Sequence, residues 1–242
     1  HLADVHFVHH DPDPALIGSN RYCPPTDHVR MDPPRGDYTK AEVYVSDTFN
    51  HHKTLSLFEN YLLTGDRRSL DAALSGLRYA YEYTRADNAY SQPRGPGNQL
   101  LTLLEGYEFT GERKYLERCS RIIQFGREAQ AKNGGAFAPQ SGQYFQVGIL
   151  LEALIRYHGI TGDESVIPMM RAALDFFIAR KSVYANCAYA AGFLHRKTGR
   201  SEYLDYALAA LTRGGVFGNP VKETGLAFRS TPYALPYLLI PE

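Results

Sequence analysis

The amino-acid sequence predicts an all-α protein made of repeated helical hairpins. Three observations predict this fold: a Thr-Gly turn followed by a charged residue recurs, apolar residues at helical spacing flank it, and Gly- and Pro-rich segments separate the copies. Counted from Thr64 to Thr110, Thr161 and Thr198, successive copies are 46, 51 and 37 residues apart. This irregular period differs from the roughly 34 residues of tetratricopeptide repeats and favours a curved array of hairpins whose loops differ in length.

Each turn holds the residues that end one helix and begin the next. Glycine suits the left-handed position after a helix, and a following Asp or Glu caps the next helix or meets its dipole. The residues concerned are Gly65, Gly111, Gly162 and Gly199, with Asp66, Glu112 and Asp163. After the first turn, Leu70, Leu74, Leu77 and Tyr81 recur at helical spacing.

Long segments connect the hairpins at the end opposite the short turns. They cover residues 84–98, 131–143, 181–186 and 214–232 and are rich in Gly, Pro, Asn, Gln, Tyr and Arg. Because functional residues concentrate on loops held by a rigid scaffold, we expect the site at this long-loop face. Residues 1–37 contain six prolines and are predicted to form an irregular segment that packs on the helical domain, residues 38–242.

Composition narrows the class of partner. The 242 residues carry 26 basic and 26 acidic side chains, so neither nucleic acid nor an anionic membrane is an expected partner. No apolar run approaches the roughly 20 residues of a membrane span. Cys23, Cys119 and Cys187 are too far apart for a zinc site or a disulfide framework. The first residue is His1, which is consistent with a removed leader or with a piece of a longer chain; the compartment is therefore cytoplasmic, or secreted or periplasmic.

The stretch "NHHKTLSLFENYLLTGDRRSLDAALSGLRYAYEY" resembles a known class of proteins. Hairpins of the form apolar helix, "YLLTGD", amphipathic helix are typical of α/α-toroid carbohydrate-active enzymes, which include polysaccharide lyases, unsaturated-uronyl hydrolases and related glycoside hydrolases. The chain looks most like the helical domain of exo-rhamnogalacturonan lyase-like proteins, over residues 38–180 and more weakly beyond. The resemblance implies a toroid that acts on carbohydrate, and it transfers no catalytic residue.

The number of hairpins departs from that class. A full toroid of this kind has six hairpins or more, whereas this chain shows about four and a fifth starting helix at Ser230–Leu239. We therefore expect an incomplete ring, which further domains or a second chain would complete.

Two adjacent histidines, His51 and His52, are the first catalytic candidates. They stand where the first helix is predicted to begin, with Ser46 or Asp47 as its N-cap. His51 is then predicted to share a helix face with Leu55, Phe58 and Leu62. Histidine titrates near neutral pH, so either residue is suited to act as a base, an acid or a partner of a carboxylate. The alternative is a packed or capping histidine with a structural role.

Further candidates come from the loops and from the helix starts that follow them. Tyr144 and Arg94 are catalytic candidates, because Tyr can transfer a proton and Arg can hold a carboxylate through two hydrogen bonds. The predicted substrate-binding residues are His10, Asn20, Arg21, His28, Asp47, Tyr90, Asn98, Gln140, Gln146 and Arg229. No cofactor is expected; a divalent metal at the N-terminal cluster of His6, His9, His10, Asp11 and Asp13 is a weaker alternative, since no known ligand spacing is present.

The residue types favour a lyase that acts on an acidic glycan. Uronate β-elimination needs a group that neutralises the carboxylate, a base and an acid, and Arg, Asn, Gln, His and Tyr supply these roles. A glycoside hydrolase would need a pair of carboxyl groups, and acidic residues are sparse in the long loops. A non-catalytic helical scaffold that binds a glycan or a protein is a third interpretation.

Overall fold

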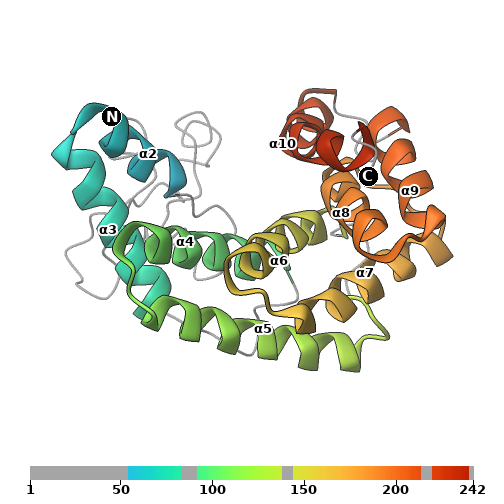
Figure 1. Ribbon diagram of the computed structural model, residues 1–242, viewed down its shortest axis with the longest axis horizontal. Coiled ribbons are helices and arrows are strands. Elements are labelled where there is room, and N and C mark those ends of the chain that lie inside the picture. The colour runs from blue at the N-terminus through green and yellow to red at the C-terminus, as the bar shows by residue number, and fades with distance from the viewer. Residues whose placement is uncertain (1–53, 83–91, 138–143, 214–219, 240–242) are drawn as a thin grey trace, which may run out of the picture. The chain divides into compact units, whose positions relative to one another are not determined.

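The computed structural model describes residues 54–82, 92–137, 144–213 and 220–239 and confirms the all-α prediction over these ranges, where no strand occurs. The α-helices are α2 (Leu55–Thr64), α3 (Arg67–Glu82), α4 (Arg94–Thr110), α5 (Lys114–Lys132), α6 (Val147–Thr161), α7 (Ile167–Ala179), α8 (Ala188–Thr198), α9 (Ser201–Arg213) and α10 (Pro220–Leu239) (Figure 1). Short 3₁₀ helices precede three of them, at η5 (Tyr144–Gln146), η6 (Glu164–Val166) and η7 (Ala185–Cys187).

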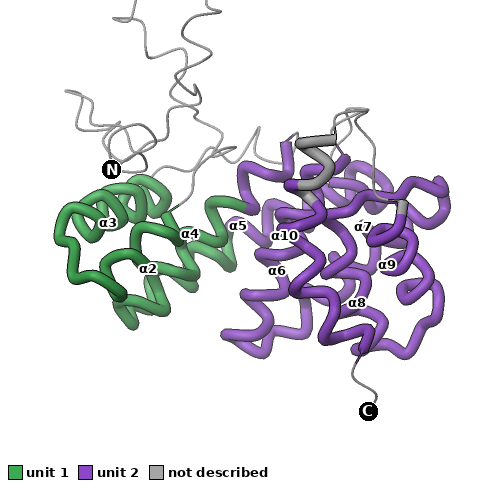
Figure 2. Tube along the Cα trace, turned by 90° about the horizontal axis from the view of Figure 1, so that it is seen from above, with its two compact units in different colours: residues 1–89, 98–121 green, residues 90–97, 122–242 purple. Residues whose placement is uncertain are grey.

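The chain forms two compact units, coloured separately in Figure 2. Unit 1 comprises His1–Ala89 and Asn98–Arg121, and unit 2 comprises Tyr90–Gly97 and Ile122–Glu242. Both units draw on the residues that the sequence assigned to one helical domain, while the predicted N-terminal segment, residues 1–37, lies outside the described residues.

The four Thr-Gly turns are confirmed as tight helix-to-helix connections. Their glycines have φ angles of 73°, 74°, 69° and 69°, which only glycine adopts without strain. The preceding threonine also takes part, because its hydroxyl donates to the carbonyl four residues back at 2.6–2.7 Å. The same hydroxyl accepts the backbone N–H two residues ahead at 3.1–3.4 Å. One threonine therefore secures the end of the first helix and the start of the turn.

Two of the three predicted acidic caps are present. Asp66 accepts the N–H of Arg68 at 3.3 Å, and Asp163 accepts the N–H of Ser165 at 2.9 Å. Glu112 instead pairs with Lys114, with 2.5 Å between Oε2 and Nζ. Its longer side chain reaches the ammonium beside it.

In unit 1, α3 and α4 pack together and α2 covers them. The first helix buries Leu57 and Phe58, and the ring of Phe58 lies 4.9 Å from that of Phe109. Leu77 of α3 fills the space beside Gly106 of α4, where a Cβ atom would overlap it. The two helices therefore approach closely because Gly106 lacks a side chain.

In unit 2, α6, α8 and α10 follow one another, and α7 and α9 pack against them (Figure 1). Close contacts at glycines set the spacing. A Cβ atom on Gly148 would lie 2.5 Å from the carbonyl oxygen of Asn186, and one on Gly192 would lie 3.2 Å from Cβ of Tyr237. The amide of Asn186 also donates to the carbonyl of Phe145, which joins the starts of α6 and α8.

The predicted start of the first helix is wrong. The sequence placed it at Ser46 or Asp47, whereas α2 begins at Leu55, after Thr54. Leu55, Phe58 and Leu62 lie on one side of α2, as predicted, and of these three only Phe58 is buried, since Leu55 and Leu62 are 39% and 69% exposed. The hydroxyl of Thr54 bonds to the buried carboxylate of Glu105 at 3.1 Å rather than capping the helix.

Two segments predicted as loops are partly helical. Arg94 begins α4. Gly97 in this helix lies against the backbone of Leu150, where an added Cβ atom would be 2.8 Å from the Leu150 nitrogen. Pro220 begins α10, where the missing N–H of a proline costs nothing. Arg229 therefore lies on a helix and not in a loop.

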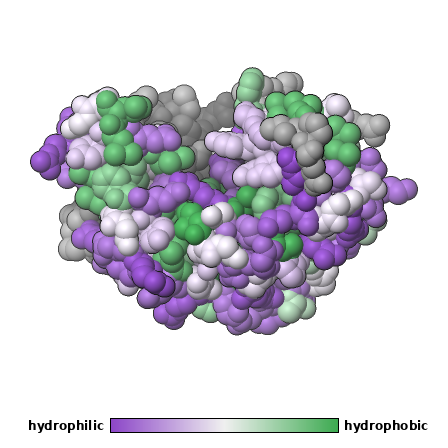
Figure 3. Space-filling model, viewed as in Figure 1, coloured by the Kyte–Doolittle hydropathy of each residue, from purple (hydrophilic) through white to green (hydrophobic). Residues whose placement is uncertain are grey.

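Large apolar side chains remain exposed at α2 and at α10 (Figure 3). On α2 these include Leu62 and Leu63, at 69% and 86% exposure. On α10 they include Phe228 and Leu239, at 74% and 70%.

Candidate functional site

Two helices of unit 2 are buried almost all round, and their few solvent-accessible side chains are polar. Between Val147 and Tyr157, α6 is buried except at Glu152 and Arg156. Between Ala188 and Leu194, α8 is buried except at Tyr189. A charged side chain on such a helix needs a partner, because an isolated charge is costly to remove from water.

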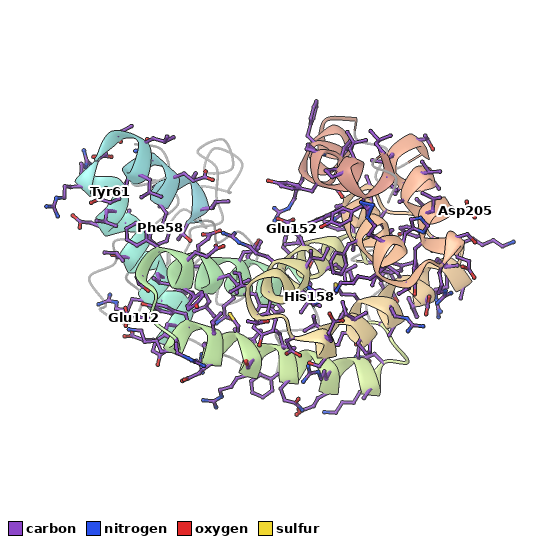
Figure 4. All side chains as sticks on the ribbon, viewed as in Figure 1. Phe58, Tyr61, Glu112, Glu152, His158 and Asp205 are labelled. Atoms are coloured by element: carbon purple, nitrogen blue, oxygen red, sulfur yellow. The ribbon has the colours of Figure 1, made fainter. Side chains whose placement is uncertain are left out.

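The partner of Glu152 comes from α10. Nε of Arg229 lies 2.6 Å from Oε2 of Glu152, and the two side chains are 26% and 25% exposed. Figure 4 labels Glu152 on α6. The pair joins segments that are 77 residues apart in the sequence.

A partly buried hydrogen bond joins α10 to the start of α8. The backbone N–H of Tyr189 donates to Oγ of Ser230 at 2.9 Å, and Ser230 is buried. This N–H belongs to the first turn of α8. Ser230 thereby supplies a cap from another helix and fixes the position of the adjacent Arg229.

Three tyrosine rings of α8 and α10 lie against one another. The ring centroid of Tyr189 lies 5.5 Å from that of Tyr233 and 5.8 Å from that of Tyr237. Tyr233 is 56% exposed and presents a flat apolar face to solvent. We call Glu152, Tyr189, Arg229 and Tyr233 the Glu152–Arg229 site.

The surroundings of Tyr189 keep its hydroxyl protonated. Burial raises the pKa of Tyr189 well above its usual range, and Tyr237 and the negative charge of Glu152 raise it further. At neutral pH this phenol is therefore protonated and able to donate a hydrogen bond.

Arg229 is the sequence-predicted residue that the structure places in this site. Tyr144 lies at the start of η5, where its ring centroid is 5.6 Å from that of Phe176 and 5.9 Å from that of Phe177. Its ring therefore packs on α7. Gln146 is buried at the start of α6, with 2% of its surface exposed.

The two remaining described candidates lie on α4. Arg94 is the first residue of this helix. Asn98 is buried, at 3% exposure, and shares a face of α4 with Thr102 and Glu105 by its spacing. Thr54 donates to Glu105 at 3.1 Å and lies 3.3 Å from the hydroxyl of Thr102. This buried polar cluster ties the start of α2 to α4.

The other predicted site residues lie outside the described residues. They are the catalytic candidates His51 and His52 and the substrate-binding candidates His10, Asn20, Arg21, His28, Asp47, Tyr90 and Gln140. The N-terminal His and Asp cluster, with its weaker metal prediction, lies outside them too. Within the described ranges, no three His, Cys, Asp or Glu side chains are grouped to hold a metal ion.

Sequence reasoning missed Glu152 and Tyr189. A signal for Glu152 was available, since "VGILLEALIRYHGIT" is apolar around Glu152 and Arg156, which are four residues apart and share a helix face. A charged pair inside an apolar helix marks a polar strip on a buried element. Tyr189 carried no such signal in "AYAAGFL", where a tyrosine is an ordinary core residue.

Comparison with protein-family models, with curated proteins and with solved structures finds no match to this chain. Among the helices that the structure describes, none has the length and apolar character needed to cross a membrane.

Proposed function

We propose that the protein is a carbohydrate-active enzyme that cleaves a uronate-containing glycan by β-elimination, with the Glu152–Arg229 site holding the sugar chain. One observation carries the proposal. Two mostly buried helices, α6 and α8, and the more exposed helix α10 bring a carboxylate, a guanidinium and two tyrosines to one partly exposed place. Polar groups that converge beside aromatic surface are typical of small-molecule and sugar sites.

Each group suits a sugar ligand. The exposed ring of Tyr233 offers a flat face for the apolar side of a sugar ring. Glu152 accepts hydrogen bonds from hydroxyl groups. Arg229 donates through Nε to Glu152, and its two terminal nitrogens are the donors that would hold a substrate carboxylate.

Two of the three roles in β-elimination fall to this site. Arg229 would neutralise the uronate carboxylate, so that the proton on the adjacent carbon becomes acidic. Tyr189, which stays protonated, would donate its proton to the departing glycosidic oxygen. The base remains a prediction from the sequence, with His51 and His52 as the candidates.

The fold and partner proposals follow the same resemblance. We propose that the hairpins are part of an α/α toroid. The short turns at one end and the packing of α6, α8 and α10 in sequence support this arrangement. Further domains or a second chain would complete the ring.

The direct test is an assay on uronate-containing oligosaccharides that records ultraviolet absorbance of unsaturated uronates together with release of reducing ends. We expect both signals to rise. Tyr189→Phe should lower kcat by about 10²- to 10⁴-fold, the usual contribution of a positioned proton donor. Tyr81→Phe, in unit 1, is the control and should keep full activity. If neither signal rises with any glycan, or if Tyr189→Phe keeps full activity, the lyase proposal is refuted.

Glu152 favours a glycoside hydrolase as the second candidate. Such an enzyme uses two carboxyl groups, roughly 5–10 Å apart, and Glu152 would be one of them. In that case reducing ends would increase without ultraviolet absorbance, and Glu152→Gln would abolish turnover. Glycan binding without either product would instead assign the site to a non-catalytic scaffold.

A further inference from the structure

Helix α7 ends in a backbone conformation that glycine normally adopts, but a lysine occupies the position. Lys181 has a φ angle of 54°, and among the described residues it is the one non-glycine residue with a positive φ. The N–H of Lys181 donates to the carbonyl of Ile178, and the N–H of Ser182 donates to the carbonyl of Phe177, each at 3.0 Å. In this arrangement of bonds the left-handed residue is usually glycine. A lysine here is strained, and strained residues cluster at ligand sites.

The preceding residue, Arg180, lies over an aromatic ring. Its Cζ atom is 3.9 Å from the ring centroid of Phe176. The ring centroid of Tyr144 lies 5.6 Å from that of Phe176. An arginine stacked in this way keeps its N–H groups for a further partner, because the contact with the ring uses the face of the guanidinium. We call Tyr144, Phe176, Arg180 and Lys181 the Arg180 cluster.

The positive charge of the Arg180 cluster is not balanced by a carboxylate. No Asp or Glu occurs in residues 176–201. Asp175 is engaged elsewhere, since Nη1 of Arg200 and the hydroxyl of Tyr203 donate to its Oδ1 at 3.2 and 2.9 Å. Among the residues that the structure describes, none forms an ion pair with either cation of the cluster. Both cations are exposed, so a ligand can reach them.

We propose that the Arg180 cluster binds a second carboxylate of the acidic glycan, as a subsite additional to the Glu152–Arg229 site. Arginine holds a carboxylate through two parallel hydrogen bonds, and a lysine beside it adds a compact positive charge. The half-buried ring of Phe176, with Tyr144 next to it, suits the apolar side of a sugar ring. The identity of the ligand rests on the proposed function, since a uronate-containing glycan carries more than one carboxylate.

The test uses two variants of the cluster and one matched control. Arg180→Gln removes the guanidinium. Lys181→Gly removes the ammonium and places glycine in the left-handed position, so this variant should be at least as stable as the native protein. A loss of binding by Lys181→Gly therefore cannot come from a weakened fold. Lys132→Gln is the control, because Lys132 is an exposed cation in the last turn of α5, much as Arg180 is at the end of α7.

Titration calorimetry in the cold, where turnover is slow, measures the Kd of each protein for hexamers of galacturonate and of glucuronate. The same hexamers with their carboxyl groups reduced to alcohols are the neutral probes. Each cluster variant should raise the Kd for the acidic hexamer that the native protein binds by about tenfold or more, because a hydrogen bond between charged groups is lost. The control should keep the native Kd, and the neutral hexamers should bind to all four proteins alike.

Native affinity of Arg180→Gln or Lys181→Gly for the acidic hexamers would overturn the subsite, as would an equal loss of affinity in the Lys132→Gln control. A native protein that binds neither acidic hexamer would also overturn it. Tighter binding of a glutamate decapeptide than of either hexamer would overturn it too, and would indicate an acidic protein segment as the ligand.

An assay of the same proteins for unsaturated uronates separates this proposal from the lyase proposal. Weaker binding by the cluster variants without any unsaturated product would support the subsite and refute the lyase. Cleavage by the native protein together with unchanged binding by the cluster variants would refute the subsite alone.

Discussion

Close packing between α6 and η7 predicts that two chemically identical substitutions in one helix will have opposite effects. Gly148 and Gly159 both lie in α6, within unit 2. Replacing a helical glycine by alanine stabilises a helix by about 0.5–1 kcal/mol, because alanine has less backbone freedom to lose. At Gly159 nothing lies within 4 Å of the added methyl group, so this gain is realised in full.

At Gly148 the same methyl group has no space. It would lie 2.5, 2.6 and 2.7 Å from the O, Cγ and C atoms of Asn186, and two of these are backbone atoms. Overpacking of this kind costs about 1–3 kcal/mol. Because the helix gain is common to both variants, the difference between their unfolding free energies measures the packing cost alone. We expect Gly148→Ala to be less stable than Gly159→Ala by about 3 kcal/mol, the upper end of that range.

Urea unfolding followed by far-ultraviolet circular dichroism measures this difference. Both variants should show the native dependence on urea concentration, so that the midpoints can be compared directly. Agreement of the two free energies within about 0.5 kcal/mol would refute the close contact between α6 and η7.

Further predictions concern titrating side chains. Burial raises the pKa of Cys187 to about 12 and also raises the pKa of Cys119. Both thiols should therefore resist iodoacetamide at pH 8 in the native protein and react with it in urea, as measured by mass spectrometry. Labelling of either cysteine in the native protein would contradict its burial. Contacts with His158 and Lys197 lower the pKa of Glu164 in the folded protein. The ionised carboxylate therefore stabilises the fold above its unfolded-state pKa of roughly 4.3, and this stabilisation is lost as the pH falls below that value. The urea midpoints of the native protein and of Glu164→Gln should therefore differ at pH 7 and converge near pH 3; a difference that is unchanged at low pH would exclude this linkage.

The hairpins were predictable because their signals are local. The turn needs a left-handed glycine next to a helix end, and Gly65, Gly111, Gly162 and Gly199 all have that conformation. Helix starts were harder to predict. Gly97 and Pro220 are residue types typical of loops, yet each lies in a helix. Gly97 leaves room for the backbone of Leu150, and Pro220 occupies the first position of its helix, where a proline is tolerated.

The site depends on long-range packing, which a single sequence does not show. Arg229 was predicted as a ligand-binding loop residue, whereas it lies on α10 and pairs with Glu152, next to Ser230, which accepts a hydrogen bond from the N–H of Tyr189. No local pattern links residues that are 77 positions apart. The histidines at 51 and 52 remain the sequence's prediction for the base.

The threonine at each Thr-Gly turn has a consequence for how this chain can change. Its two hydrogen bonds reach only from four residues back to two residues ahead, so every turn is self-contained. Insertions at the other end of a hairpin leave these bonds intact. The separations between copies, 46, 51 and 37 residues, are unequal because the length of the chain varies away from the turns. A new binding loop grafted at the long-loop end should therefore be tolerated, whereas one inserted at Gly65 or Gly162 should not.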